Sequence, residues 1–199
     1  MNAHTQEPLA QTDEEARPLA APSALFERYR PALAANRAKG PIIDLACGRG
    51  RHALEAASSL GPVIAVDRNR TFLDELGLRS RKQGLRLARL QTDLERGFGI
   101  PLKAKSAGAI LVFRYLHRPL AKSIEALLAP GGWLLYETFT IAQAERPSGP
   151  SRPDFLLQPG ELRSLFPGLE VLHYAESEMI GKPSTSEEAV AQLVARKRG

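Results

Sequence analysis

Residues 42–53 read Ile42-Ile43-Asp44-Leu45-Ala46-Cys47-Gly48-Arg49-Gly50-Arg51-His52-Ala53. The apolar run at 42–46 predicts a strand, and the residues that follow Gly50 predict a helix. Between them, Gly48 and Gly50 can adopt backbone angles that are closed to other residues, and they let a ligand approach the main chain closely. The sequence therefore predicts a ligand-binding turn between a buried strand and a helix.

Strand and helix patterns continue to alternate after this turn. Apolar or β-branched runs that predict six further strands lie at 63–66, 85–90, 109–113, 133–138, 169–175 and 189–196. Helices are predicted at 70–82 and at 119–128, with Pro119 in the first turn of the second. Ser23 is expected to cap an earlier helix that ends near Gly40. This alternation predicts a doubly wound α/β fold with a parallel sheet and helices on both faces.

Length and composition favour one domain at 23–199. A chain of 199 residues with 43% hydrophobic residues can bury one substantial core. Residues 1–22 contain three prolines and no lasting apolar period, which predicts a flexible N-terminal arm. Cys47 is the only cysteine, and no His/Cys cluster has metal-ligand spacing, so neither a disulfide framework nor a metal site is expected. No apolar run approaches the ~20 residues of a membrane helix, which favours a cytoplasmic protein without a membrane partner.

Two classes of cofactor fit the glycine turn. The pattern Gly48-x-Gly50-x-x-Ala53 agrees with the dinucleotide fingerprint, and Asp67 follows Gly48 by nineteen positions, where a ribose partner belongs. An NAD(P)-dependent oxidoreductase is therefore one interpretation. Asp44 opposes it, because a carboxylate at the strand end would repel a pyrophosphate. S-adenosylmethionine has no phosphate and carries two positive groups, an amino group and a sulfonium, which a carboxylate favours.

The segment Asp44-Leu45-Ala46-Cys47-Gly48-x-Gly50 resembles the first motif of class I S-adenosylmethionine-dependent methyltransferases, and 63–67 and 91–94 resemble the second and third. The resemblance implies a Rossmann-like seven-stranded sheet, mostly parallel with an antiparallel C-terminal strand. It implies that the first motif holds the amino-acid end of the cofactor and that Asp67 binds the ribose hydroxyls. Arg68 would border the adenine, while Asp93 and the Leu94 backbone would bind it.

The end of the fourth strand is expected to face the methyl acceptor. Segments 114–119, 136–139 and 153–157 resemble small bacterial methyltransferases of the tellurite-resistance-like group. The Asn/Asp-Pro-Pro-Tyr/Phe signature of enzymes that methylate planar amino groups is absent, which disfavours a base-modifying enzyme. Cations and hydrogen-bond donors follow the strand instead, and they suit a small anionic acceptor. These residues are Arg114, Tyr115, His117 and Arg118, with Arg146 and Arg152 as additions from a long loop after residue 140.

The mechanism needs alignment of the acceptor and, for some acceptors, a base. His117 is the candidate base, Tyr115 a positioning group and Arg118 an anion partner, while Glu137 is a second candidate base. The alternative for His117 and Arg118 is solvation of the helix start.

Other functions stay open in the sequence. An RNA or protein methyltransferase could use a basic face, although a solvated helix face is the simpler interpretation. That face comprises Arg68, Arg70, Arg79, Arg81, Lys82, Arg86 and Arg89. A noncatalytic cofactor-binding domain is a further alternative, and the oligomeric state is open.

Overall fold

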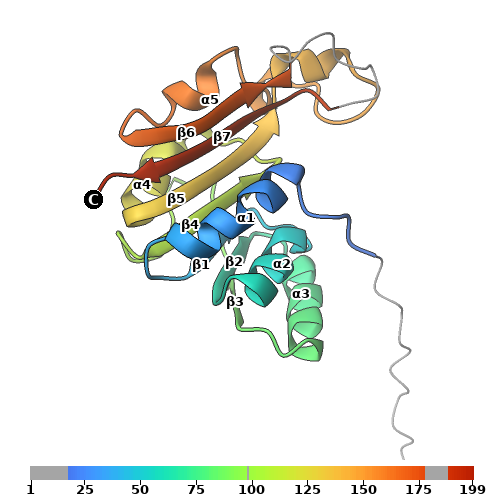
Figure 1. Cartoon of the computed structure of the whole chain (residues 1–199). Coiled ribbons are helices and arrows are strands. Elements are labelled where there is room, and N and C mark those ends of the chain that lie inside the picture. The colour runs from blue at the N-terminus through green and yellow to red at the C-terminus, as the bar shows by residue number, and fades with distance from the viewer. Residues whose placement is uncertain (1–17, 98, 178–187) are drawn as a thin grey trace, which may run out of the picture.

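The computed structural model describes residues 18–97, 99–177 and 188–199. Its strands are β1 (Ile42–Leu45), β2 (Val63–Asp67), β3 (Leu87–Gln91), β4 (Ala107–Phe113), β5 (Leu128–Phe139), β6 (Leu169–Glu176) and β7 (Val190–Lys197). They form one sheet in the order β3-β2-β1-β4-β5-β7-β6 (Figure 1). Strands β1 to β5 pair in parallel, and β7 runs antiparallel to both of its neighbours. The predicted seven-stranded fold with an antiparallel C-terminal strand is confirmed.

Strands β1 and β4 lie in the middle of the sheet. Every residue of both strands is buried, as expected for parallel strands that are covered on both faces. Ile42 of β1 lies opposite Val63 of β2 on one side and Ala109 of β4 on the other. The strand order reverses beside β1, and such a position in an open α/β sheet is where ligands bind. The glycine turn that leaves β1 therefore stands at this position.

Helices cover both faces of the sheet (Figure 1). One face carries α1 (Ala24–Asn36), α2 (Arg51–Ser59) and α3 (Arg70–Lys82), and the other carries α4 (Ala121–Leu127) and α5 (Glu161–Ser164). Successive side chains of each strand point to opposite faces of the sheet. In β4, for example, Leu111 packs into the α1–α3 cluster and Ile110 into the α4–α5 cluster. The result is a three-layer arrangement with two apolar cores.

Local sequence signals set the start of two helices. The Ser23 hydroxyl accepts a hydrogen bond from the Leu25 amide at 3.1 Å, which confirms the predicted cap of α1. The Asn69 side chain accepts from the Phe72 amide at 3.2 Å, and α3 then occupies the predicted range 70–82. At both helix starts, the capping hydrogen bond lies where the apolar period of the sequence begins.

The structure differs from the sequence prediction around the fifth strand. The helix predicted at 119–128 divides into a 3-10 turn, η1 (Arg118–Leu120), and α4, and Leu128 already belongs to β5. Leu128 pairs with Ala107 and Trp133 with Ala109, so the Pro-Gly-Gly segment bulges out of the strand. The helix prediction was wrong at Leu128 because burial against the sheet, which local propensity does not report, decides its conformation. Helix α5 was not predicted.

The predicted N-terminal arm is described only from residue 18 onward. Residues 18–22 have no regular secondary structure, yet Leu19 packs against the α1–α3 cluster. The Arg51 guanidinium donates to the carbonyl oxygen of Ala21 at 3.1 Å. The described end of the arm therefore lies against the start of α2. Within the ranges described, no helix has the length and apolar character needed to cross a membrane.

Candidate cofactor and acceptor site

Chemistry-bearing residues gather at the carboxyl edge of the sheet because parallel strands end on the same side. Asp44 lies one residue before the end of β1, Asp67 ends β2, and Asp93 follows β3 by two positions. Arg114 comes directly after β4, and Thr138 is the second-last residue of β5. Five strands thus deliver one polar residue each to a common edge.

The turn after β1 is built from left-handed backbone conformations. Ala46 has φ 53°, Gly48 φ 56° and Gly50 φ 82°. A Cβ atom at Gly48 would meet no atom within 4 Å, so the space beside it is open to a ligand. A Cβ atom at Gly50 would lie 2.5 Å from the Leu76 side chain. Gly48 is therefore required for its backbone angle, and Gly50 for its angle and for close helix packing.

Asp67 is fixed at the end of β2 by two backbone amides. Its Oδ2 atom accepts from the Gly48 amide at 2.7 Å, and its Oδ1 atom accepts from the Asn69 amide at 2.8 Å. Each carboxylate oxygen can accept a further hydrogen bond. Asp67 thereby ties the second predicted motif to the first and keeps acceptor capacity for a pair of hydroxyl groups.

Asp44 is buried without a full set of partners. The residue is 1% exposed, and its Oδ2 atom has no hydrogen-bond partner among the described residues. Burial raises the pKa of Asp44 to about 7, against partial opposition from the Ala53 backbone and Arg51. A buried carboxylate oxygen of this kind favours a cationic or hydrogen-bond-donating ligand.

The residues predicted for adenine lie on the loop after β3. The Asp93 Oδ1 atom accepts from the Glu95 amide at 3.0 Å, and the Arg96 guanidinium lies 3.3 Å from Oδ2. Leu94 is buried, whereas Arg68 is largely exposed and lies 4.0 Å from the Glu95 carboxylate. The loop geometry is thus held by Asp93 itself.

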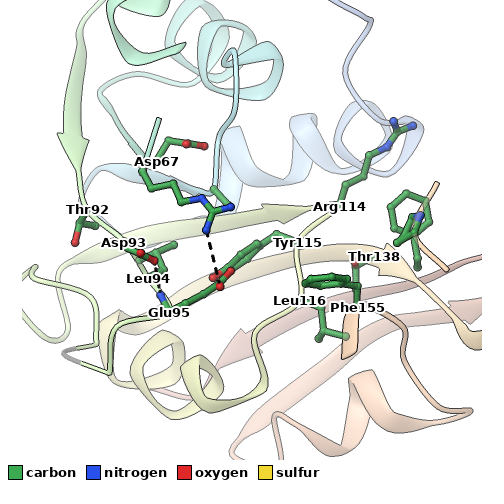
Figure 2. Close-up of a pocket in the computed structure, with 14 residues that line it drawn as sticks. Asp67, Thr92, Asp93, Leu94, Glu95, Arg114, Tyr115, Leu116, Thr138 and Phe155 are labelled. Carbon is green, nitrogen blue, oxygen red and sulfur yellow. Dashed lines mark hydrogen bonds and ion pairs between the residues drawn. The ribbon is translucent and has the colours of Figure 1, made fainter. Parts of the chain in front are cut away.

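Two adjoining pockets open at this edge, with volumes of about 340 Å³ and about 670 Å³. The first pocket (Figure 2) is lined by residues of four predicted site segments: Ala46, Asp67, Arg68, Asp93, Leu94 and Tyr115. The second is lined by the glycine turn and its strand: Asp44, Ala46, Cys47, Gly48 and Gly50. Leu45 is the one predicted cofactor residue that lines neither pocket, because its side chain is buried in the α4–α5 cluster. Ala46 and Arg114 line both pockets.

Tyr115 lines the first pocket and points toward the loop after β3 that carries Asp93 and Glu95 (Figure 2). Its hydroxyl is buried and has no hydrogen-bond partner within the described chain. Burial raises the pKa of this hydroxyl above its ordinary value, and the charges of Glu95 and Asp93 raise it further. The phenol therefore stays protonated and can donate a hydrogen bond to a ligand in this pocket.

His117 and Arg118 are placed differently from Tyr115, since neither lines the two pockets. The Arg118 guanidinium forms a two-point ion pair with Glu161, at 2.5 and 3.0 Å. It also donates to the carbonyl oxygens of Asp154 and Leu156. Arg118 thus joins η1 to the segment that precedes α5. His117 is half-buried, and its carbonyl accepts from the Leu120 amide at 3.0 Å.

Three other predicted groups have defined surroundings. Glu137, the second candidate base, accepts on Oε2 from the Ser23 hydroxyl at 3.0 Å and from the Gln192 side chain at 2.7 Å. The Arg152 guanidinium lies 3.1 Å from the Asp154 carboxylate, and neither Arg152 nor Arg146 lines the two pockets. The structure therefore does not bring these groups together with Tyr115.

The sequence prediction missed a histidine inside the glycine-turn segment. His52 stacks on Phe113 at 3.8 Å between ring centroids, and its Nε2 atom accepts from the Ser23 amide at 3.0 Å. Burial, assisted by the charges of Arg51 and Arg114, lowers the pKa of His52 to about 3. The ring is therefore neutral and anchors the start of α1. Its position two residues after Gly50, on the first turn of the helix, was the available signal.

No metal-binding group is evident in the described ranges, where three or more His, Cys, Asp or Glu side chains do not converge. Burial, followed by the charge of Asp44, raises the pKa of the Cys47 thiol, which keeps it protonated.

Residues 42–132, a little under half of the chain, match the family described as "Methyltransferase domain". This range runs from β1 to the start of β5 and contains all the residues predicted to bind the cofactor. No curated protein matches the sequence significantly.

Solved structures resemble the chain in fold. TehB from Haemophilus influenzae is 18% identical, with 87% of this chain and 61% of that chain covered and a TM-score of 0.64. An S-adenosylmethionine-dependent methyltransferase from Aquifex aeolicus is 15% identical, with coverages of 85% and 88% and a TM-score of 0.63. The [4+2]-cyclase SpnF is 16% identical, with coverages of 86% and 80% and a TM-score of 0.65. At these identities the likeness concerns the fold alone.

The family match covers the segment that carries the glycine turn, and the fold is that of the methyltransferases compared. The match of residues 42–132 to a methyltransferase domain and the shared fold both support the enzyme class predicted from the sequence, an S-adenosylmethionine-dependent methyltransferase.

Proposed function

We propose that this enzyme transfers the methyl group of S-adenosylmethionine to a small anionic acceptor. The observation that carries the proposal is the pair of carboxylates at the carboxyl edge. Asp44 is buried with an oxygen that lacks a partner, and Asp67 is held by two amides with free acceptor capacity. The first suits an amino or sulfonium group and the second suits ribose hydroxyls.

The residues present fit this cofactor. The open space beside Gly48 admits a ligand to the main chain, and the unpartnered Asp44 oxygen can accept a hydrogen bond from an ammonium group. Asp67, Asp93 and the Leu94 backbone would hold the adenosine part in the first pocket. When bound there, the cofactor supplies a methyl group on a sulfonium, which is already a good leaving group.

The chain's own residues then have to align an acceptor and exclude water. Arg114 lines both pockets, and its guanidinium, which pairs with the Glu188 carboxylate at 2.6 Å, brings a positive charge to their junction. Thr138 is buried at the end of β5, and Phe139 and Phe155 add apolar side chains to the lining of the first pocket. A cation beside apolar walls favours a small acceptor with an anionic end. We keep the roles predicted for His117 and Arg118 as proposals to be tested by substitution.

The direction of α3 argues against the alternative in which a basic face binds RNA or a protein. A helix that connects two parallel strands runs antiparallel to them. The basic last turn of α3, with Arg79, Arg81 and Lys82, therefore lies at the amino edge of the sheet. The pockets lie at the carboxyl edge, so this last turn is far from methyl transfer. Of the basic face, only its start at Arg68 and Arg70 lies near the pockets, which leaves a short basic surface there and supports a small acceptor.

The cofactor assignment is tested by calorimetry with adenosylhomocysteine, NAD and NADP. We expect adenosylhomocysteine alone to bind, and Asp67→Ala to weaken it by about tenfold or more, because each ribose hydroxyl loses a charged acceptor. Asp74→Ala is the matched control, since Asp74 lies on α3 outside both pockets, where it pairs with Arg70 and Arg89. Equal affinity of wild type and Asp67→Ala would remove Asp67 from the site.

The acceptor is sought by following adenosylhomocysteine release. The resemblance of 114–119 to the tellurite-resistance-like group makes tellurite and selenite the first acceptors to test, followed by small carboxylates and thiols. We expect the wild type to methylate at least one of these anions. Arg114→Gln should show a raised KM for that anion and should still convert S-adenosylmethionine to adenosylhomocysteine. Turnover only with neutral acceptors would contradict the anionic class while leaving methyl transfer in place.

A further inference from the structure

The Arg114 guanidinium, which borders both pockets, already has an anionic partner within the chain. Its Nη2 atom donates to the Glu188 carboxylate at 2.6 Å, although 74 positions separate the two residues in the sequence. Glu188 lies two positions before β7 and lines neither of the two pockets. Figure 2 shows the Arg114 side chain extending away from Tyr115, Leu116 and Phe155. Glu188 therefore holds the guanidinium from outside the pockets.

Backbone contacts fix both ends of this ion pair. The Arg114 amide donates to the Glu137 carbonyl oxygen at 2.8 Å, and the Arg114 backbone adopts φ 57°. On the other side, the amide of Ala189, which follows Glu188, donates to the buried Gln143 side chain at 2.7 Å. Main-chain atoms that are themselves held in place thus present the carboxylate to Arg114.

The ion pair is weak enough for a ligand to replace it. The Arg114 side chain is 46% exposed and the Glu188 side chain 42%, so water screens their attraction. One nitrogen of the guanidinium bonds to Glu188, whereas arginine binds a carboxylate most strongly through two parallel bonds. The guanidinium carbon lies 5.9 Å from the ring centroid of Phe139, which lines the first pocket. The guanidinium thus stands beside the first pocket, where an anion can approach it.

Attachment to the chain gives the Glu188 carboxylate an advantage over free anions. A tethered group competes at an effective concentration of about a millimolar or more. An anion that binds through its charge alone has to exceed this concentration before it displaces Glu188. An anion with a further contact does not, and the first pocket offers such a contact at Phe155, whose side chain is 42% exposed, and at Leu116. Apolar surface buried there adds binding free energy that Glu188 does not gain.

We propose that Glu188 determines the acceptor specificity by competing for Arg114, so that the site selects an organic anion with an apolar body over a small hydrophilic anion. The inference rests on the proposed function, because the selected anion is the methyl acceptor, and it narrows the acceptor to a carboxylate or thiolate attached to an apolar group. Glu188 acts through Arg114 and does not touch the reacting atoms.

Calorimetry on the enzyme saturated with adenosylhomocysteine tests this proposal. The probes are formate and benzoate, which share a carboxylate and differ in their apolar body. Wild type should bind benzoate more tightly than formate. Glu188→Gln should tighten both by a similar factor, ~2- to 5-fold, as expected for loss of a partly exposed ion pair that competes with the probe. This gain should vanish when Arg114→Gln is also present.

Glu27→Gln is the matched control for the loss of one paired glutamate. Glu27 is 40% exposed and pairs with Arg30 on α1, and neither residue lines the two pockets. This variant should bind both probes as wild type does. A general effect of net charge on anion binding would instead appear equally in Glu27→Gln and Glu188→Gln, and it would overturn the proposal.

The other outcomes are equally direct. Weaker binding of both probes by Glu188→Gln would mean that Glu188 orients Arg114 for the anion, and unchanged binding would mean that the two do not compete. Equal affinity of wild type for formate and benzoate would overturn the selection of an apolar body. If neither probe binds to wild type or Glu188→Gln, the inference fails together with the anionic acceptor class. Adenosylhomocysteine is titrated first, so a failure of the cofactor site is seen separately.

Discussion

At the scale of single residues, Asp44 shows that part of the site is unfavourable for the fold. Its carboxylate is buried, and burial raises its pKa from 3.8 to about 7, with Arg51 opposing and Asp67 adding to the rise. Between these two pKa values the folded chain binds more protons than the unfolded chain. The stability contributed by protonated Asp44 is therefore lost as the pH rises from about 4 to about 7.

We expect Asp44→Asn to raise the free energy of unfolding at neutral pH by about 1–3 kcal/mol, because it removes a buried charge without altering the shape of the side chain. The same change should weaken adenosylhomocysteine. Thermal unfolding from pH 4.5 to 7.5 checks the first part: wild type should lose stability relative to the variant over this range. A parallel pH dependence of the two proteins would show that Asp44 does not titrate there. Glu170→Gln, at an exposed carboxylate of β6, provides the control.

At the scale of elements, one ion pair joins two segments that border the site. Arg118 of η1 pairs with Glu161 of α5 and donates to the carbonyls of Asp154 and Leu156. The 3-10 turn η3 (Pro153–Phe155) lies in this segment, and Phe155 lines the first pocket. The pair thus positions a wall of the pocket from outside it.

This arrangement predicts that Arg118→Ala lowers the free energy of unfolding by about 1–2 kcal/mol, the loss expected for a partly exposed two-point pair and two carbonyl bonds. Glu161→Gln should lower the melting temperature to a similar extent, since it breaks the same ion pair. Both changes should raise the KM of the acceptor, because the wall of the first pocket at Phe155 loses its support. Adenosylhomocysteine affinity should stay unchanged in both. If Arg118→Ala abolishes turnover while Glu161→Gln is fully active, Arg118 contacts the acceptor directly, as the sequence suggested.

At the scale of the whole molecule, the described end of the N-terminal arm contributes to the second pocket. Pro18, Leu19 and Ala20 line it, and the Ala21 carbonyl accepts from Arg51. Residues 1–17 have no periodic apolar face in the sequence. These two facts give different expectations for two truncations.

Deletion of residues 1–17 is expected to leave adenosylhomocysteine affinity and melting unchanged. Deletion of residues 1–22 should weaken the affinity several-fold, because a wall of the pocket and the bond to Arg51 are both lost, and it should lower the melting temperature slightly. Calorimetry and thermal melting of the two shortened chains check this. Equal affinity in both would mean that the arm is dispensable for the cofactor.

The sequence by itself determined the order of strands and helices, the glycine turn and the acids at three strand ends. The first two features depend on neighbours in the chain, since Ser23 caps its own helix and Gly48 sets its own backbone angle. The third follows from strand direction, because parallel strands bring Asp44 and Asp67 to one edge of the sheet. Periodicity and turn chemistry report such local preferences directly. For this reason nine of the ten residues predicted for the cofactor line the two pockets.

Only the tertiary structure decided which charged groups have partners. Arg118 is held by Glu161, 43 positions away, and Ser23 bonds to Glu137 across 114 positions. The same packing turned Tyr115 toward the loop after β3 and brought Arg51 and Arg114 into one pocket. Whether an ionisable side chain is free to bind a ligand depends on burial and on groups from distant segments, and a one-dimensional pattern contains neither quantity.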